Sequence, residues 1–152
     1  MDNPPPIPFY LSTRFLVLTI GIPFCVFKLL FGLLFLKVGH GNHFFIHIVV
    51  GWAIVLWSSI DLGMNVIRLS LDFFHKKPLI EFCLLAQVGK IFNRQSLFLT
   101  LDTLLSFSII CLTLWTGWIK LLTPAEAYFW YGATTVNLIS LGIINVWQEI
   151  KH

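Results

Sequence analysis

Three ionisable residues, Lys28, Asp61 and Asp102, lie inside long apolar stretches of this 152-residue chain. A charge placed in hydrocarbon costs about 2.5–3.5 kcal/mol on insertion scales, so such residues persist where a partner, a cavity or a function offsets that cost. Two carboxylates held close together can share a proton or bind a cation. These three residues are therefore the first candidates for chemistry in this sequence.

The two aspartates are predicted to lie at similar depths. A helical rise of ~1.5 Å per residue puts Asp61 ~10 Å from Arg68 and Asp102 ~12 Å from Arg94, measured from the same membrane boundary. Asn65 follows Asp61 by one helical turn. Carboxylates and an amide at one level predict a shared polar site.

Asn145 is predicted to lie on the same side, ~6 Å from Glu149. The four residues then form either a cavity open to the cytoplasm, which binds a cation or passes a proton, or a set of polar contacts between helices. The second interpretation is the simpler one. In it, Asp61 pairs with Arg68 on its own helix and Asp102 bonds a neighbouring helix.

Lys28 is predicted to lie deeper in the membrane than either aspartate. The preferred interpretation is that its long side chain extends outward to the interface or meets a partner subunit. In the alternative, it faces the interior and pairs with Asp61 or Asp102, which requires a vertical reach of ~6–9 Å or more.

Histidines gather at the start of the second apolar stretch. His43 and His47 share a helical face, a spacing that can chelate a metal or ligate haem or chlorophyll. No other stretch offers a histidine to match them, so a bis-histidine haem within the chain is not expected. The sequence requires no cofactor.

The composition indicates that the apolar stretches of this chain are surrounded by lipid. Hydrophobic residues make up 57% of the chain and charged residues 11%, against about 25% charged in soluble domains. We predict an all-α integral membrane protein with one domain over residues 1–152, a Pro-rich tail at 1–9 and a four-helix bundle. The predicted transmembrane helices cover residues 10–36, 44–69, 96–122 and 124–149.

Local signals refine these helices. Gly21 and Pro23 predict a kink in the first, and residues 40–43 a tight turn after it. Thr123, Pro124 and Glu126 predict a capped start for the fourth. Small residues predict close helix contacts at several other positions, namely Gly63, Gly117, Gly132, Ala133 and Gly142.

The connector over residues 70–95 is strongly basic. Its segment 78–94 predicts an amphipathic helix in the membrane plane, with basic residues facing lipid headgroups or a partner. The basic residues of the connector that are expected to face lipid or a partner are Lys76, Lys77, Lys90 and Arg94. The positive-inside rule then puts the connector and both termini on the cytoplasmic side of a bacterial inner, thylakoid or organelle membrane.

Motifs for common enzyme classes do not occur: the chain has no HExxH, GxSxG, Walker A or paired-cysteine pattern. We therefore expect a non-catalytic accessory, assembly or scaffold subunit of a larger membrane complex. Its expected partners are lipids and other membrane subunits or copies of itself, and no nucleic acid. The alternative is a small oligomeric ion or proton channel or transporter that uses Asp61 and Asp102.

Overall fold

A computed structural model describes residues 12–42, 44–74 and 80–151. The Pro-rich tail, His43, Lys76 and Lys77 lie outside these ranges. Among the described residues, four helices are long and apolar enough to cross a membrane, as an integral membrane protein requires. They are Thr13–Gly41, Phe45–Phe73, Gln95–Trp115 and Pro124–Trp147.

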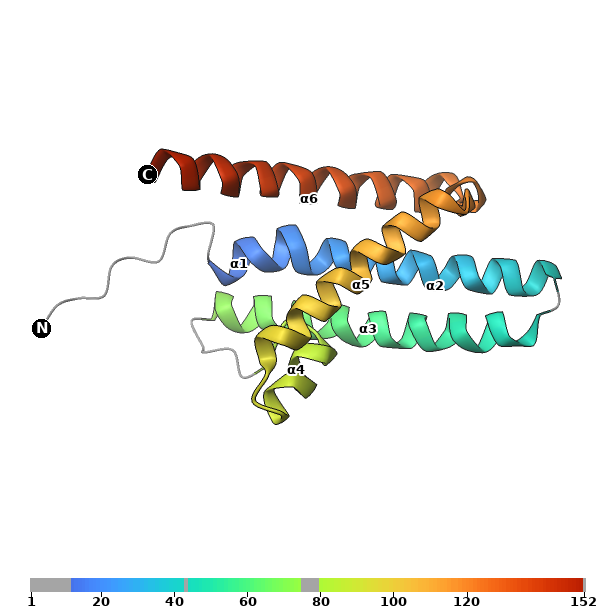
Figure 1. The fold of residues 1–152 in the computed structure, drawn as a ribbon, viewed down its shortest axis with the longest axis horizontal. Coiled ribbons are helices and arrows are strands. Elements are labelled where there is room, and N and C mark those ends of the chain that lie inside the picture. Colours follow the sequence, from blue (N-terminus) through green and yellow to red (C-terminus); the bar gives the residue numbers. More distant parts are fainter. Residues whose placement is uncertain (1–11, 43, 75–79, 152) are drawn as a thin grey trace, which may run out of the picture.

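The described residues form a series of helices. The first membrane helix contains α1 (Thr13–Leu16), a π-helical turn (Val17–Gly21) and α2 (Ile22–Asn42). The remaining elements are α3 (Phe45–Phe73), α4 (Leu84–Ile91), α5 (Gln95–Trp115), a 3-10 helix (Trp118–Leu121) and α6 (Pro124–Lys151). The predicted helix between the second and third spans is thus present as α4. Figure 1 shows α2, α3 and α6 aligned along the long axis while α5 crosses them obliquely.

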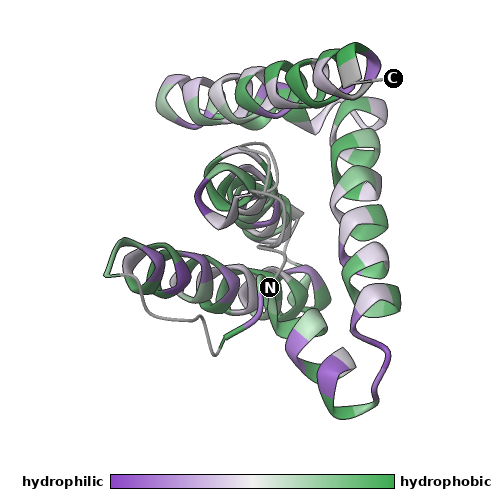
Figure 2. Ribbon diagram, turned by 90° about the vertical axis from the view of Figure 1, so that its left-hand side faces the viewer, coloured by the Kyte–Doolittle hydropathy of each residue, from purple (hydrophilic) through white to green (hydrophobic). Residues whose placement is uncertain are grey.

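The central element is α2. Viewed from one end, it lies in the middle, with α3, α5 and α6 around it (Figure 2). Half of the most apolar stretch of the first span is buried, compared with 17–22% in the other three spans. The other three helices therefore keep broad faces on the outside of the molecule.

The three outer helices bury mainly small or polar residues. These residues recur at intervals of three, four or seven, which places them on one face of each helix. They are Gly51, Ser58, Asp61 and Asn65 on α3, Asp102, Ser106, Ile109 and Thr113 on α5, and Trp130, Ala133, Asn137 and Ser140 on α6. Most large aliphatic side chains on these helices point outward, a distribution that suits a lipid surround.

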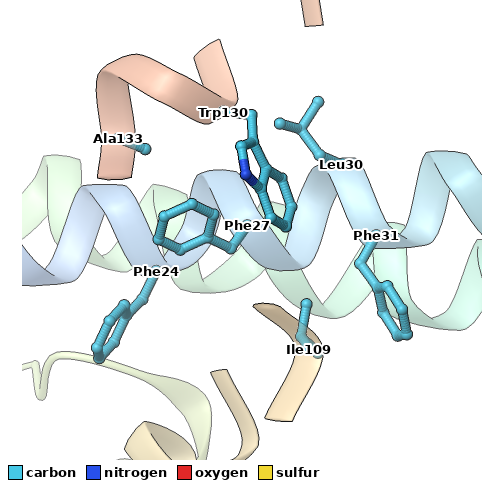
Figure 3. Packing of buried hydrophobic residues seen from close by; sticks show 7 residues of the cluster. All are labelled: Phe24, Phe27, Leu30, Phe31, Ile109, Trp130 and Ala133. Carbon is cyan, nitrogen blue, oxygen red and sulfur yellow. The ribbon is translucent and has the colours of Figure 1, made fainter. Parts of the chain in front are cut away.

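Aromatic side chains of α2 form an apolar cluster with α5 and α6. Phe27 packs edge to face on Trp130 with ring centroids 5.0 Å apart. Ile109 and Ala133 complete the contact from the outer helices (Figure 3). This cluster includes Phe24 on one side of Lys28 and reaches, through Phe31 and Trp118, the turn that joins α5 to α6.

Glycines allow α2 and α3 to approach closely. A Cβ atom at Gly51 would lie 2.8 Å from Leu36, and one at Gly32 would lie 2.8 Å from Val55. The glycines predicted to mark helix contacts do not do so: a Cβ atom would meet nothing within 4 Å at Gly63, Gly117, Gly132 or Gly142. Within the chain these four glycines therefore contact no neighbouring helix, whereas Ala133 is buried.

Two predicted boundaries were wrong. The first helix continues to Asn42, so the turn expected at 40–43 is largely helical. At the other boundary, α5 ends at Trp115 rather than at 122. Gly117 adopts a left-handed conformation with φ 72°, which stops the helix there.

The predicted cap of α6 is confirmed. The backbone N–H of Thr123 donates to Glu126 Oε2 at 2.7 Å, and the N–H of Glu126 donates to Thr123 Oγ1 at 3.4 Å. Lys37 Nζ also binds Glu126 Oε2, at 2.5 Å, which ties the start of α6 to the end of α2.

Candidate functional site

Lys28 lies at the centre of a buried charge cluster. Its Nζ atom is 2.9 Å from Asp61 Oδ2 on α3 and 2.5 Å from Asp102 Oδ1 on α5. All three residues are at most 5% exposed. Nζ also lies 4.8 Å from the ring centroid of Trp57, a cation–π contact.

The preferred sequence interpretation of Lys28 was therefore wrong, and the alternative describes the structure. The side chain does not extend to the interface, because α2 is surrounded by the helices that carry the two carboxylates. We call these residues, Lys28, Asp61 and Asp102, the charge triad. It joins α2, α3 and α5 through one ammonium group.

The charge triad also holds the connector. Asp61 Oδ1 accepts the backbone N–H of Leu84 at 2.7 Å, at the first residue of α4. A carboxylate is favoured there because the N-terminus of a helix carries partial positive charge. Asn65 Nδ2 donates to Phe82 O at 2.8 Å and to Asp61 O at 2.9 Å. The segment before α4 is thus fastened to α3 on both sides of Cys83.

Asn145 does not join this group. Its side chain is exposed on α6, and Asn137 faces the interior in its place. Asn137 Nδ2 donates to the carbonyl oxygen of Thr19 at 3.4 Å. Pro23 explains this contact, because it lacks the N–H that would bond the Thr19 carbonyl in a regular helix.

Sequence inspection missed Asn137, although Pro23 was a usable signal. The expected irregularity at Gly21 and Pro23 takes the form of the π-helical turn Val17–Gly21. A proline in a helix identifies a carbonyl four residues earlier that needs another donor. It does not identify the helix that supplies the donor.

The simpler interpretation required an ion pair between Arg68 and Asp61, and this pair is not present. The Nη1 atom of Arg68 donates to Ile80 O at 3.0 Å and lies 3.6 Å from Glu81 Oε2. Glu81 also accepts from Lys90 Nζ at 3.2 Å and from Gln95 Nε2 at 2.5 Å. Arg68 and Lys90 therefore organise the connector, whereas the side chain of Arg94 is exposed.

A cavity of about 260 Å³ adjoins the charge triad. It lies between the first membrane helix, α5, α6 and the segment before α4, and its walls are mostly apolar. Its lining residues are Leu16, Ile20, Gly21, Phe24, Cys25, Lys28, Asn65, Phe82, Cys83, Leu99, Asp102, Thr103, Phe107, Asn137 and Leu141.

Two residues that line this cavity each carry an oxygen atom without a hydrogen-bond donor among the described residues. Asn65 Oδ1 is buried and has no partner among the described residues. Asp102 binds Lys28 through Oδ1, which leaves Oδ2 for another donor. With one ammonium and two carboxylates, the ionised charge triad has a formal charge of −1.

The histidines form no comparable site in the described part of the chain. The ring of His47 stacks on Phe35 with centroids 5.6 Å apart, and its buried Nδ1 atom has no partner among the described residues. His40 Nδ1 lies 2.7 Å from Leu36 O. Within the described ranges, no group of three or more His, Cys, Asp or Glu side chains is arranged to hold a metal ion.

Cys83 is expected to resist thiol reagents in the folded protein. Burial, with a smaller contribution from the negative charge of Asp102, raises the pKa of its thiol from 9.0 to about 12. The raised pKa lowers the reactive thiolate fraction at pH 8 from about one in ten to about one in ten thousand. In a Cys25→Ser, Cys111→Ser background, mass spectrometry should show slow maleimide labelling before SDS is added and rapid labelling after. Equal rates would contradict the burial of this thiol.

Comparisons with protein-family models, with curated proteins and with solved structures found no significant match for this chain.

Proposed function

We propose that this chain is a non-catalytic accessory, assembly or scaffold subunit of a larger membrane complex, and that it docks through the outward face of α6. The observation that carries the proposal is a set of small and polar positions among the large apolar side chains of this surface. Gly132 and Gly142 have open space where a Cβ atom would lie, and Asn145 is exposed. We call these three positions the α6 face.

Lipid tails alone would neither pack closely on the α6 face nor satisfy the hydrogen bonds of its amide. Small residues in membrane helices are typical of positions where another helix approaches closely, and an amide in hydrocarbon lacks a hydrogen-bond partner. A shallow depression surrounds Gly142, formed by Ile139, Ile143, Val146 and Trp147. A transmembrane helix of another subunit would fill this depression and offer Asn145 a partner.

The buried charges support the same proposal. Lys28, Asp61 and Asp102 bind one another and the connector, which is what a structural role requires. The aromatic cluster around Phe27 and Trp130 fills the bundle beyond them. No chemical step has to be assigned to these residues to account for their presence in the membrane.

The docking proposal is tested by filling the depression. Gly142→Leu should release the protein from its complex, because the larger side chain occupies the space that a partner helix needs. Gly63→Leu is the matched control, since Gly63 is equally open but lies on α3. Native mass spectrometry after mild-detergent purification should show a hetero-oligomer for the wild type and for the control. A lone monomer or homo-oligomer for the wild type would contradict the proposal.

We further propose that the end bearing α4 faces the cytoplasm. Both ends of the described chain lie towards this end (Figure 1). Arg14, Arg68, Lys90 and Arg94 belong to it, whereas Lys37 and Lys120 belong to the opposite end. Exposed Ile91 and Phe92 at the end of α4 suit insertion among lipid headgroups beside these basic residues.

A second candidate function is a small oligomeric channel or transporter. One observation favours it: Asp102 lines a cavity on the proposed cytoplasmic side. The apolar cluster between that cavity and the far end of the bundle argues against a path through a single chain. This function predicts ion or proton flux in liposomes that Asp102→Asn abolishes. Flux that survives Asp61→Asn and Asp102→Asn together, or that is never observed, would exclude it.

A further inference from the structure

We propose that the cavity beside the charge triad binds a small hydrophobic amine, with the ammonium group at Asp102 and the apolar part between α5 and α6. This binding site is separate from the docking surface proposed for α6. Three features of the cavity support it: the spare carboxylate oxygen of Asp102, the negative formal charge and the apolar walls.

Asp102 specifies a donor. It lines the cavity, its Oδ1 atom binds Lys28 Nζ, and no described residue donates a hydrogen bond to its Oδ2 atom. A carboxylate oxygen without a donor beside mostly apolar walls is costly, so a ligand that donates hydrogen bonds would be stabilised here. Asn65 also lines the cavity, but Gly21 covers its Oδ1 atom: a Cβ atom at Gly21 would lie 2.4 Å from it.

The negative formal charge of the charge triad favours a positively charged hydrogen-bond donor over a neutral one. Lys28 neutralises only one of the two carboxylates that it contacts. An ammonium group near Asp102 Oδ2 would bring the ionised cluster to a formal charge of zero. A phosphate or carboxylate group would be repelled from the same place.

The walls select an organic cation over an inorganic one. Phe24, Leu99, Phe107 and Leu141 contribute apolar surface from α2, α5 and α6. A metal ion or a hydrated proton would leave these side chains without a contact, whereas an alkyl or ring substituent would cover them. The volume of about 260 Å³ lies just below the range of about 300–1,000 Å³ typical of drug-sized ligands, so the occupant is small.

The arrangement of the helices suits entry from the bilayer. Figure 1 shows α5 diverging from α6 towards the end that bears the C-terminus. The cavity takes lining residues from both helices in that part of the bundle, Leu99 and Thr103 from α5 and Leu141 from α6. A hydrophobic amine that partitions into the membrane would meet this region directly.

The test uses octylamine with a diazirine near the end of its chain, with the alcohol and carboxylate of the same chain as comparisons. The full-length protein in nanodiscs is irradiated with each probe, and cross-linked residues are mapped by mass spectrometry. The amine should label residues of α5 and α6 at the cavity about tenfold more than either comparison, since charge-assisted hydrogen bonds exceed neutral ones. Equal labelling by all three probes would overturn the proposal, because it would show partition without recognition.

Variants assign the recognition to named atoms. Asp102→Asn should reduce amine labelling about tenfold, to the level of the alcohol. Gly21→Ala should also reduce it, because Gly21 lines the cavity and its added Cβ atom would displace the side chain of Asn65, another lining residue. Gly63→Ala is the matched control and should leave labelling unchanged, since its Cβ atom meets nothing within 4 Å. Undiminished amine labelling in Asp102→Asn would refute the assignment.

A further variant covers the case in which Asp102→Asn does not fold. Leu141→Trp reduces the cavity volume but leaves every acceptor in place. Size-exclusion chromatography identifies the folded fraction of each variant before irradiation. Folded Leu141→Trp should lose cavity labelling by the amine, and retention of wild-type labelling would place the bound amine elsewhere.

Discussion

Replacing Lys28 with methionine is expected to destabilise the folded protein by about 3–5 kcal/mol, more than the loss of either aspartate charge. The ammonium group is the only positive charge within the charge triad, and Asp61 and Asp102 both bind it. Its removal leaves two carboxylates facing each other in a buried site. Unfolding in detergent by SDS titration measures the effect.

Asp61→Asn and Asp102→Asn should each cost less, within about 2 kcal/mol. Either change leaves Lys28 with one carboxylate, so the remaining ion pair is formally neutral. Asn at position 61 also keeps an oxygen that can accept the N–H of Leu84, the contact that holds α4.

A combined variant provides the control. Lys28→Met with both Asp→Asn changes removes the unbalanced charge and should recover much of the stability that Lys28→Met alone loses. A Lys28→Met protein as stable as either aspartate variant would show that the charge triad is not the junction of α2, α3 and α5.

Gly51→Ala and Gly63→Ala are expected to change stability in opposite directions although both lie on α3. The Cβ atom at position 51 would lie 2.8 Å from the side chain of Leu36 and 3.0 Å from its backbone nitrogen, so α2 and α3 must separate. Overpacking of this kind costs about 1–3 kcal/mol. At position 63 nothing lies within 4 Å, and alanine should stabilise the helix by about 0.5–1 kcal/mol.

SDS titration of the two alanine variants in one detergent supplies the comparison. Because the substitutions are identical and share a helix, intrinsic helix propensity is matched between them. Destabilisation by both, or by neither, would be inconsistent with the packing of α2 on α3.

The misplaced residues share one physical cause. Depth along a helix follows from counting residues, which is why Asp61, Asn65 and Asp102 were grouped. Direction around the helix does not follow from counting when apolar side chains surround it on every side. Lys28 was therefore assigned to the outside, and Asn145 was chosen although Asn137 is the amide that faces inward.

The helix contacts predicted at glycines are absent within the chain for the same reason. In a soluble protein, hydropathy separates the buried face of a helix from the exposed one, but lipid is as apolar as the protein interior. The positions Gly63, Gly132 and Gly142 were predicted to be contacts from residue size alone. The contacts between α2 and α3 instead use Gly32 and Gly51, whose neighbours Val55 and Leu36 become known only when the helices are paired.

Sequence alone determined the features that depend on local chemistry. The four apolar helices follow from hydropathy and length, the cap at Thr123 and Glu126 from residue type at a fixed spacing, and the irregular turn before Pro23 from a missing N–H. Tertiary structure decided that α2 lies at the centre. That placement turns Lys28 from an isolated charge into the shared partner of Asp61 and Asp102, because a buried ammonium is stabilised only where carboxylates from other helices meet it.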